Sequence, residues 1–369
     1  MNKSFSSLLF RESIGLLQNL ISVPSFSNQE DQAAELWEYW LKGKGIVNVK
    51  RFHNNVYALS EDFDPKKPTL LLNSHLDTVK PVDSYTRDPF KAEIIGDRLF
   101  GLGSNDAGAS GISLAATFIE FYKRKNLNFN ILLAITASEE RMGELGMRAF
   151  LPFLRNEGIY PDMAIVGEPT GMEAAIGERG LVVIDATVAG KAGHAARDEG
   201  ENAIYKAIED IQSLRKLDFP KKSDVLGPLK LNVTMISAGT QHNVIPDCCN
   251  YVIDVRTTDA YSNEKTVEII KNAVRFSKIQ PRSTRIHPSV IDEAHILVKA
   301  AELSGLKTFI STTTSDMALM YDIPSIKLGP GKSERSHTAD EFILLSEIEE
   351  AMKIYPVLLR NLDNLLKKN

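Results

Sequence analysis

The chain has 369 residues, of which 43% are hydrophobic and 25% charged, a balance typical of a globular protein whose length favours two domains. A net charge of −5 argues against a nucleic-acid partner, because phosphate contacts require a basic face. Uninterrupted apolar stretches stay well short of the roughly 20 residues of a membrane span, so we expect no membrane partner. Cys248 and Cys249, which are adjacent and the only cysteines, favour reduced residues in a cytoplasmic protein.

The first part of the chain predicts alternating helices and strands. An amphipathic helix ends before Pro24, and residues 31–41 form a second helical pattern before Gly43. Short apolar runs, which are typical of strands buried on both faces, occupy residues 69–72, 130–135, 163–166 and 324–328, with a helical pattern over 110–121. This alternation predicts an α/β layer fold.

The middle of the chain follows a different order. Strand, helix, strand, strand, helix and strand are predicted in turn over residues 181–189, 202–216, 231–237, 250–257, 263–277 and 283–287. This is the β-α-β-β-α-β order of a ferredoxin-like sandwich. Buried-strand patterns resume at 308–310, so we predict a larger α/β domain of residues 1–178 and 290–369, interrupted by a small domain of residues 179–289.

Polar side chains lie at or near predicted strand ends at five separate places. Taken alone, each has an ordinary explanation, such as a helix cap for Asp106 or solvated surface for an acid pair. Ligand sites in open α/β sheets nevertheless favour the carboxyl ends of strands. Two histidines and three carboxylates suit two divalent cations that share one carboxylate, with zinc preferred and cobalt or manganese as alternatives. These residues are His75, Asp106, Glu140, Glu168 and His337.

The motifs around these residues resemble the metallopeptidase family that contains acetylornithine deacetylase, succinyl-diaminopimelate desuccinylase, aminoacylase and glutamate carboxypeptidase. The resemblance covers nearly the whole chain and implies a zinc-exopeptidase-like α/β/α catalytic domain with an inserted ferredoxin-like lid and dimerisation domain. It also implies that one cation binds His75, Asp106 and Glu168, and the other Asp106, Glu140 and His337. Asp77 would support His75, and Glu139 would be the general base.

The resemblance extends to the inserted domain. His194 resembles the family's lid histidine, which stabilises the oxyanion, often across a dimer interface, so we expect a homodimer. Asn243 and Arg256 resemble the residues that hold substrate, although a strand arginine paired with a structural carboxylate is an alternative for Arg256. Gly329 and Gly331 would leave room for substrate against the backbone, which a tight turn explains equally well.

The function that we infer is hydrolysis of a small N-acyl amino acid by metal-activated water. The motifs look closest to acetylornithine-deacetylase-like members, which implies acetyl- or succinyl-ornithine, -citrulline or -lysine as substrate and a role in arginine biosynthesis. Those members often continue Asp-Met-Lys-Gly where this chain has Asp106-Ala107-Gly108-Ala109, which weakens the substrate inference. The alternatives are a metallo-carboxypeptidase or dipeptidase, and a non-catalytic metal-dependent binding protein, against which the complete ligand set and Glu139 argue.

Overall fold

A computed structural model describes residues 7–197 and 199–368. The chain divides into two compact units. One unit comprises Met1–Ile176, Ile291–Phe309 and Ser315–Asn369, and the other comprises Gly177–Val290 and Ile310–Thr314. All five predicted cation ligands belong to the first unit, whereas His194, Asn243 and Arg256 belong to the second.

The first unit is built on a mixed β-sheet with a parallel centre. The central strands β6, β3, β7 and β17 run parallel, and every one of their residues is buried. The sheet order is β1-β2-β6-β3-β7-β17-β8-β15, with β16 paired to β8. The strands are β1 (Lys50–Phe52), β2 (Asn55–Leu59), β3 (Thr69–His75), β6 (Asn130–Thr136), β7 (Met163–Val166), β8 (Ala174–Glu178), β15 (Ser289–Val290), β16 (Thr308–Ser311) and β17 (Ser325–Lys327).

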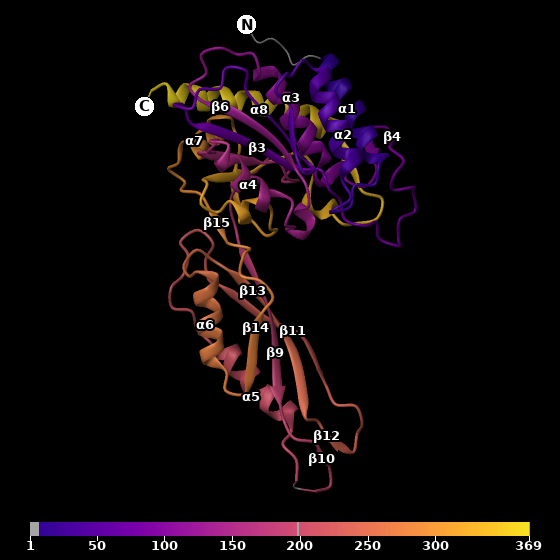
Figure 1. The fold of residues 1–369 in the computed structure, drawn as a ribbon, viewed down its shortest axis with the longest axis vertical. Helices are drawn as coiled ribbons and strands as arrows, with labels where there is room; N and C mark the ends of the chain where they lie inside the picture. Colours follow the sequence, from indigo (N-terminus) through magenta and orange to yellow (C-terminus); the bar gives the residue numbers. More distant parts are fainter. Residues whose placement is uncertain (1–6, 198, 369) are drawn as a thin grey trace. The chain divides into compact units, whose positions relative to one another are not determined.

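Helices cover both faces of this sheet (Figure 1). On one face α4 (Met147–Asn156) packs against a buried cluster that includes Leu71, Leu132 and Ala164. Because successive strand residues point to opposite faces, their neighbours form the other face, which α3 (Ala109–Phe121) contacts. The remaining helices of this unit are α1 (Ser7–Ile21), α2 (Asp31–Gly43), α7 (Ile296–Leu303) and α8 (Leu345–Leu366). The α/β/α layers expected from the sequence are confirmed.

Short elements complete the first unit. Three strands form a small antiparallel sheet in the order β18-β5-β4, with bounds Phe342–Leu344, Arg98–Phe100 and Glu93–Ile95. Four short helical turns lie in the loops: η1 (Ser104–Gly108), η2 (Glu139–Arg141), η3 (Asp316–Leu319) and η4 (Ser333–Arg335). Two of these turns, η1 and η2, carry predicted site residues.

The second unit has the predicted β-α-β-β-α-β order. Its antiparallel sheet runs β11-β13-β9-β14, which is the ferredoxin-like arrangement. The elements are β9 (Gly180–Ala189), α5 (Ala203–Lys216), β11 (Lys230–Ala238), β13 (Cys248–Thr257), α6 (Asn263–Ala273) and β14 (Ser277–Pro281), with a separate two-stranded ladder of β10 (Gly193–His194) and β12 (Val244–Ile245).

One predicted strand of this unit was wrong. Residues 283–287 form no strand, and the fourth strand is β14, which begins six residues earlier where the sequence had suggested the end of a helix. Among the described strands β14 pairs only with β9, at the edge of the sheet, and it buries a single apolar side chain, Ile279. Such a strand leaves little hydrophobic alternation to detect.

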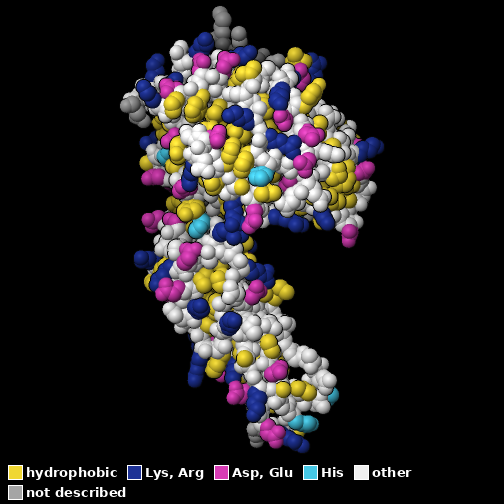
Figure 2. Space-filling view, in the orientation of Figure 1, with side chains coloured by type: hydrophobic (Ala, Val, Ile, Leu, Met, Phe, Trp, Pro, Cys, Tyr) yellow, Lys and Arg dark blue, Asp and Glu magenta, His cyan; other side chains and the backbone are white. Residues whose placement is uncertain are grey.

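The surface and the helices carry two further observations. On the face drawn in Figure 2, acidic and basic side chains are interspersed over both units. Among the described helices, none has the length and apolar composition that crossing a membrane requires.

Candidate metal centre

Three central strands deliver polar residues to one edge of the sheet. β3 ends at His75, β6 leads into η2 with Glu139 and Glu140, and β7 is followed by Glu168 two residues later. Because these strands are parallel, their carboxyl ends lie at the same edge, where open α/β sheets bind ligands. Asp106 reaches this edge from η1, and His337 from the loop after η4.

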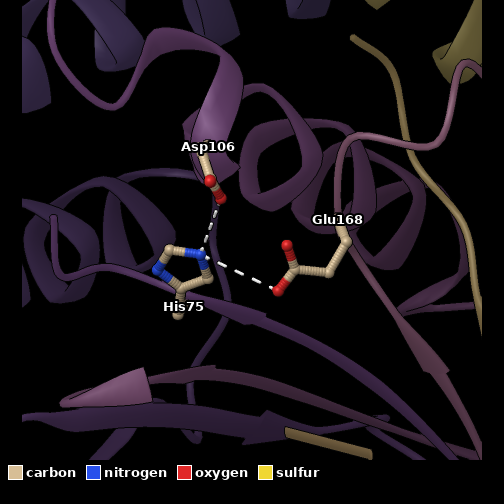
Figure 3. A group of neighbouring side chains, drawn as sticks. All are labelled: His75, Asp106 and Glu168. Carbon is tan, nitrogen blue, oxygen red and sulfur yellow. Dashed lines mark hydrogen bonds and ion pairs between the residues drawn. The ribbon is translucent and has the colours of Figure 1, made fainter. Parts of the chain in front are cut away.

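The first group of candidate ligands surrounds the buried His75. Its Nε2 lies 3.3 Å from an Asp106 oxygen and 3.8 Å from a Glu168 oxygen, and the two carboxylates approach the ring from different sides (Figure 3). Its Nδ1 donates to the main-chain carbonyl of Asp77 at 2.9 Å. Since a carbonyl can only accept, this hydrogen bond fixes the proton on Nδ1 and leaves the Nε2 lone pair for a cation.

The second group shares Asp106 and is more open. The other Asp106 oxygen lies 3.6 Å from His337 Nε2, which is 3.0 Å from a Glu140 oxygen. The His337 side chain is 54% exposed, compared with 1% for His75. In each group the three ligand atoms lie within 4.8 Å of one another, and Asp106 contributes to both. The structure therefore brings together all five residues predicted as ligands.

The electrostatics of the site fit bound cations. Burial, with repulsion from neighbouring carboxylates, raises the pKa of Glu168 to about 8. Burial and the charge of Glu168 raise the pKa of Glu139 well above its usual range. The hydrogen bond with Glu140 raises the pKa of His337 to about 9. Mutually repelling buried carboxylates are unfavourable without a partner, and divalent cations held by these donors would offset the repulsion.

In the first group, His75 and Asp106 shift each other's pKa in opposite directions. Although burial disfavours the imidazolium, hydrogen bonds with Asp106 and Asp77 raise the pKa of His75 well above its ordinary value. Burial likewise opposes ionisation of Asp106, but the hydrogen bond and charge of His75 lower the pKa of this carboxyl. The pair thus favours an ionised Asp106, as a shared ligand requires.

Asp77 orients the loop that carries the predicted base. Its carboxylate accepts the main-chain N–H groups of Glu139 at 2.9 Å and Glu140 at 3.2 Å, and the Ser27 hydroxyl at 2.7 Å. The same carboxylate lies 3.6 Å from His75 Nδ1, whose hydrogen bond goes to the Asp77 main chain. Asp77 therefore contacts both His75 and the two residues that follow β6.

Sequence reasoning missed a second carboxylate that holds this loop. Glu30 is 1% exposed and accepts hydrogen bonds from the Ser138 N–H and hydroxyl, at 3.2 and 2.9 Å. Ser138 has a left-handed backbone with φ of 55°, directly before Glu139. Glu30 precedes a predicted helix, where an acidic residue is ordinary, so the sequence offered no signal of its burial.

Similarity to known proteins shows the family to which the chain belongs. Residues 71–361 match Peptidase family M20/M25/M40. The chain belongs to this family. It is 27% identical to succinyl-diaminopimelate desuccinylase from Wolbachia pipientis wMel, over 95% of this chain and 93% of that protein. It is 28% identical to the protein of the same name from Dinoroseobacter shibae, over 94% of this chain and 98% of that one.

Solved structures share the M20 fold at low identity. Aminopeptidase PepT from Bacillus cereus has a TM-score of 0.77 at 19% identity, covering 96% of this chain and 98% of that chain. A dinuclear metal binding peptidase of the M20 family from Bacillus subtilis has a TM-score of 0.74 at 17% identity, covering 99% and 100%. These matches confirm the M20 architecture, and with the clustered ligand groups the chain is a metal-dependent hydrolase of this family.

Two glycines of the M20 site are needed for internal packing. A Cβ on Gly329 would lie 2.5 Å from the Glu168 carbonyl oxygen and 2.2 Å from the Ser110 hydroxyl. Gly331 has a φ of +85°, and a Cβ there would lie 2.3 Å from Asn105 Oδ1. Both positions therefore fit the tight-turn explanation, and the space that they would leave for substrate stays a prediction.

The second unit of this M20 hydrolase brings His194 and Asn243 together. Pairing of β10 with β12 places His194 opposite Val244, and the Ala195 N–H donates to the Asn243 carbonyl at 3.0 Å. The His194 side chain is exposed. Arg256 donates from Nε and Nη2 to the Asp254 carboxylate, at 2.9 and 3.2 Å. The roles of these three residues toward substrate stay predictions.

Proposed function

We propose that this M20 hydrolase removes an acyl group from an N-acyl amino acid, with two divalent cations and Glu139 as general base. The observation that carries the proposal is the pair of ligand groups that share Asp106, next to the buried carboxyl of Glu139. The desuccinylase names of the curated relatives support a deacylase. The dinuclear peptidase that shares the fold supports two cations, and the histidine and carboxylate donors favour zinc.

The residues of the site divide the reaction between them. Two cations, held by the His75–Asp106–Glu168 and Asp106–Glu140–His337 groups, would polarise the scissile carbonyl and lower the pKa of a water molecule to near neutrality. Glu139 accepts a proton from the attacking water and returns it to the leaving nitrogen as the C–N bond breaks, so that a carboxylic acid and an amine are released. Burial raises the pKa of the Glu139 carboxyl, which suits this double role, because a base that must later act as an acid works best near the operating pH.

The residues of the inserted unit would recognise the substrate. We propose that His194 stabilises the oxyanion and that Asn243 and Arg256 bind the amino-acid portion, Arg256 through a bidentate contact with a carboxylate. Arg256 already binds Asp254 in this way, so its fork geometry is suited to a carboxylate, and substrate would have to compete with Asp254. Gly329 and Gly331 would line the path of the substrate backbone.

The names of the relatives support the proposal that N-succinyl substrates are preferred to N-acetyl ones. Both curated relatives described above are succinyl-diaminopimelate desuccinylases, and neither is an acetylornithine deacetylase. This order is tested by measuring kcat/KM with zinc for a panel of substrates. The panel contains N-succinyl-diaminopimelate, N-succinylornithine, N-acetylornithine, N-acetylcitrulline and dipeptides. We expect at least one N-acyl amino acid to exceed every dipeptide by about tenfold or more. Faster turnover of dipeptides would instead support the carboxypeptidase or dipeptidase alternative.

We also propose a cytoplasmic homodimer formed through the inserted unit. Among the described strands β11 pairs only with β13, and its outer edge carries Met235 and Ile236, which are 64% and 55% exposed. An unpaired edge with exposed apolar side chains is suited to pairing with a second copy. Light scattering tests the dimer, and a fully active monomer would reject it.

Mixing two inactive variants tests whether His194 acts across that dimer. A heterodimer of Glu139→Ala and His194→Ala protomers keeps one intact site only if His194 serves the partner's site. Recovery of activity on mixing therefore supports action in trans. Two variants that stay inactive after subunit exchange, verified by mass, would show that His194 serves its own protomer.

A further inference from the structure

Glu341 is a buried carboxylate that binds the loop carrying Asp106. Its side chain accepts the main-chain N–H groups of Gly103 at 3.0 Å, Asn105 at 2.8 Å and Asp106 at 2.9 Å. Its own carbonyl accepts the N–H of Gly101 at 3.0 Å. Glu341 is 2% exposed, so these hydrogen bonds form away from water, where they are hard to replace.

Asn105 makes the reciprocal connection from the same loop. Its side chain is fully buried and pairs with the main chain of Lys332 in both directions, with Nδ2 donating to the carbonyl and Oδ1 accepting the N–H, each at 3.0 Å. Nδ2 also donates to the Ser336 hydroxyl at 3.3 Å. Ser336 directly precedes His337, so Asn105 binds the segment that delivers the exposed histidine.

These contacts join two segments that are more than 200 residues apart in sequence. Residues 101–106 carry the shared carboxylate Asp106, and residues 332–341 carry His337. Gly331 fits the same arrangement, because any Cβ there would collide with Asn105 Oδ1. The hydrogen bonds run in both directions, so neither segment can shift without breaking contacts made by the other.

We propose that Asn105 and Glu341 form a clamp that positions Asp106 relative to His337 and thereby sets the cation affinity of the Asp106–Glu140–His337 group. Both are positioning residues, since neither side chain belongs to a ligand group. The clamp acts mainly on the second group because His75 ends a central strand and Glu168 closely follows one, whereas His337 lies in the loop that the clamp itself binds. This inference rests on the proposed function, because it assumes that the two groups bind cations.

Stepwise titration of the metal-free protein with Co²⁺ or Zn²⁺ tests the clamp, using calorimetry and the visible spectrum of Co²⁺. We expect Asn105→Ala to weaken one binding step by about 10- to 100-fold, as for other outer partners of metal ligands, and to change the other step much less. The weakened step should be the one that His337→Ala abolishes. Glu341→Gln keeps nearly the same shape but replaces one accepting oxygen with an NH₂ group, which cannot accept a hydrogen bond from the main-chain N–H that it faces. This variant should weaken the same step.

Asp210→Asn is the matched control. Asp210 is also a buried carboxylate that accepts three main-chain N–H groups, those of Arg275, Phe276 and Ser277, but it lies in the inserted unit. It should lower thermal stability and leave both binding steps unchanged.

The outcomes separate this proposal from the proposed function. A wild-type protein that binds no divalent cation rejects the function itself. A wild-type protein that binds two, with folded Asn105→Ala and Glu341→Gln variants that bind both equally well, rejects the clamp alone. Equal weakening of both steps would also reject it, because the loss would then be general.

Discussion

The two ligand groups differ in how the fold holds them. His75 ends a central strand and is 1% exposed, whereas His337 lies in a loop, has a φ of 58° and is 54% exposed. The histidine of the first group is therefore fixed by the sheet that forms the core, and the histidine of the second group is carried by a loop that hydrogen bonds hold to other loops. The shared carboxylate of Asp106 therefore connects a group whose histidine is held rigidly by a strand to a group whose geometry depends on side-chain contacts.

The largest effect on kcat is expected from substitution of Glu139, which should reduce catalysis without reducing cation binding in either group. Glu139→Gln removes the proton-transfer group but no predicted ligand, so kcat should fall by about 10²- to 10⁴-fold while both cations remain. Steady-state kinetics and metal analysis on one sample measure this. Glu144→Gln, in the same loop with a side chain that is 82% exposed, is the control and should retain activity. Substantial activity in Glu139→Gln would reject the base assignment.

The second prediction tests the contrast between the two histidines directly. His75→Ala should abolish one binding step and weaken the other, because the partly buried Asp106 loses its hydrogen-bond partner. His337→Ala should abolish one step only and leave the His75–Asp106–Glu168 group able to bind. Both losses should exceed the ~10–100-fold cost of removing an outer partner. Metal content after dialysis distinguishes them, and identical losses in the two variants would contradict the comparison.

A third prediction concerns Asp77, which contacts His75 of the first ligand group and the main chain of Glu139 and Glu140, the latter in the second group. Asp77→Asn turns one acceptor into a donor that faces a main-chain N–H, so the loop after β6 should be displaced. We expect kcat to fall by about 10- to 100-fold, as for other outer partners, with a smaller change in KM. Asp31→Asn, an exposed carboxylate that pairs with Arg51, is a suitable control. An increase in KM alone would indicate that Asp77 acts on substrate binding.

The smallest effect is a dependence of metal-free stability on pH. Burial raises the pKa of Glu168 and of Glu341 to about 8, from about 4.3 in an unfolded chain. Between these values the folded state binds protons that the unfolded state releases, so the free energy of unfolding should fall as pH rises from about 5 to 8. His337, with its pKa raised to about 9, acts in the same direction above about 6.5.

Thermal denaturation with a chelator and with zinc measures this dependence. The metal-free Tm should be lower at pH 8 than at pH 6. Zinc should raise Tm more at pH 8, because deprotonated ligands bind cations better. Glu168→Gln should reduce the metal-free slope, and a metal-free Tm that rises steadily between these pH values would contradict the assignment.

The sequence indicated the candidate ligands more readily than the contacts that position them. His75, Asp106 and Glu168 could be predicted as candidate ligands because each lies at or near the end of a strand or in a glycine-rich turn, and ligand sites favour the carboxyl ends of such strands. Asn105 and Glu341 could not, since an asparagine and a glutamate in polar loops look like surface residues until burial is known. Their partners are main-chain groups more than 200 residues away, which leave no mark on local sequence.

In the fold, too, features that depend on local sequence could be predicted, and features that depend on distant contacts could not. The apolar runs of the fully buried strands β3, β6 and β7 could be predicted, because strands covered on both faces are rich in apolar residues. The edge strand β14 was misplaced because only Ile279 must be buried. Pairing partners and register depend on contacts across the chain, which hydrophobic periodicity does not specify.

The openness of His337 has a practical consequence for preparing the protein. An ion held by an imidazole that is 54% exposed can be reached by a small chelator, whereas the ion beside His75 is shielded. Brief dialysis against a weak chelator should therefore yield a uniform species loaded at one position only. Adding a different, spectroscopically visible ion afterwards would give a mixed-metal form in which each position can be followed separately.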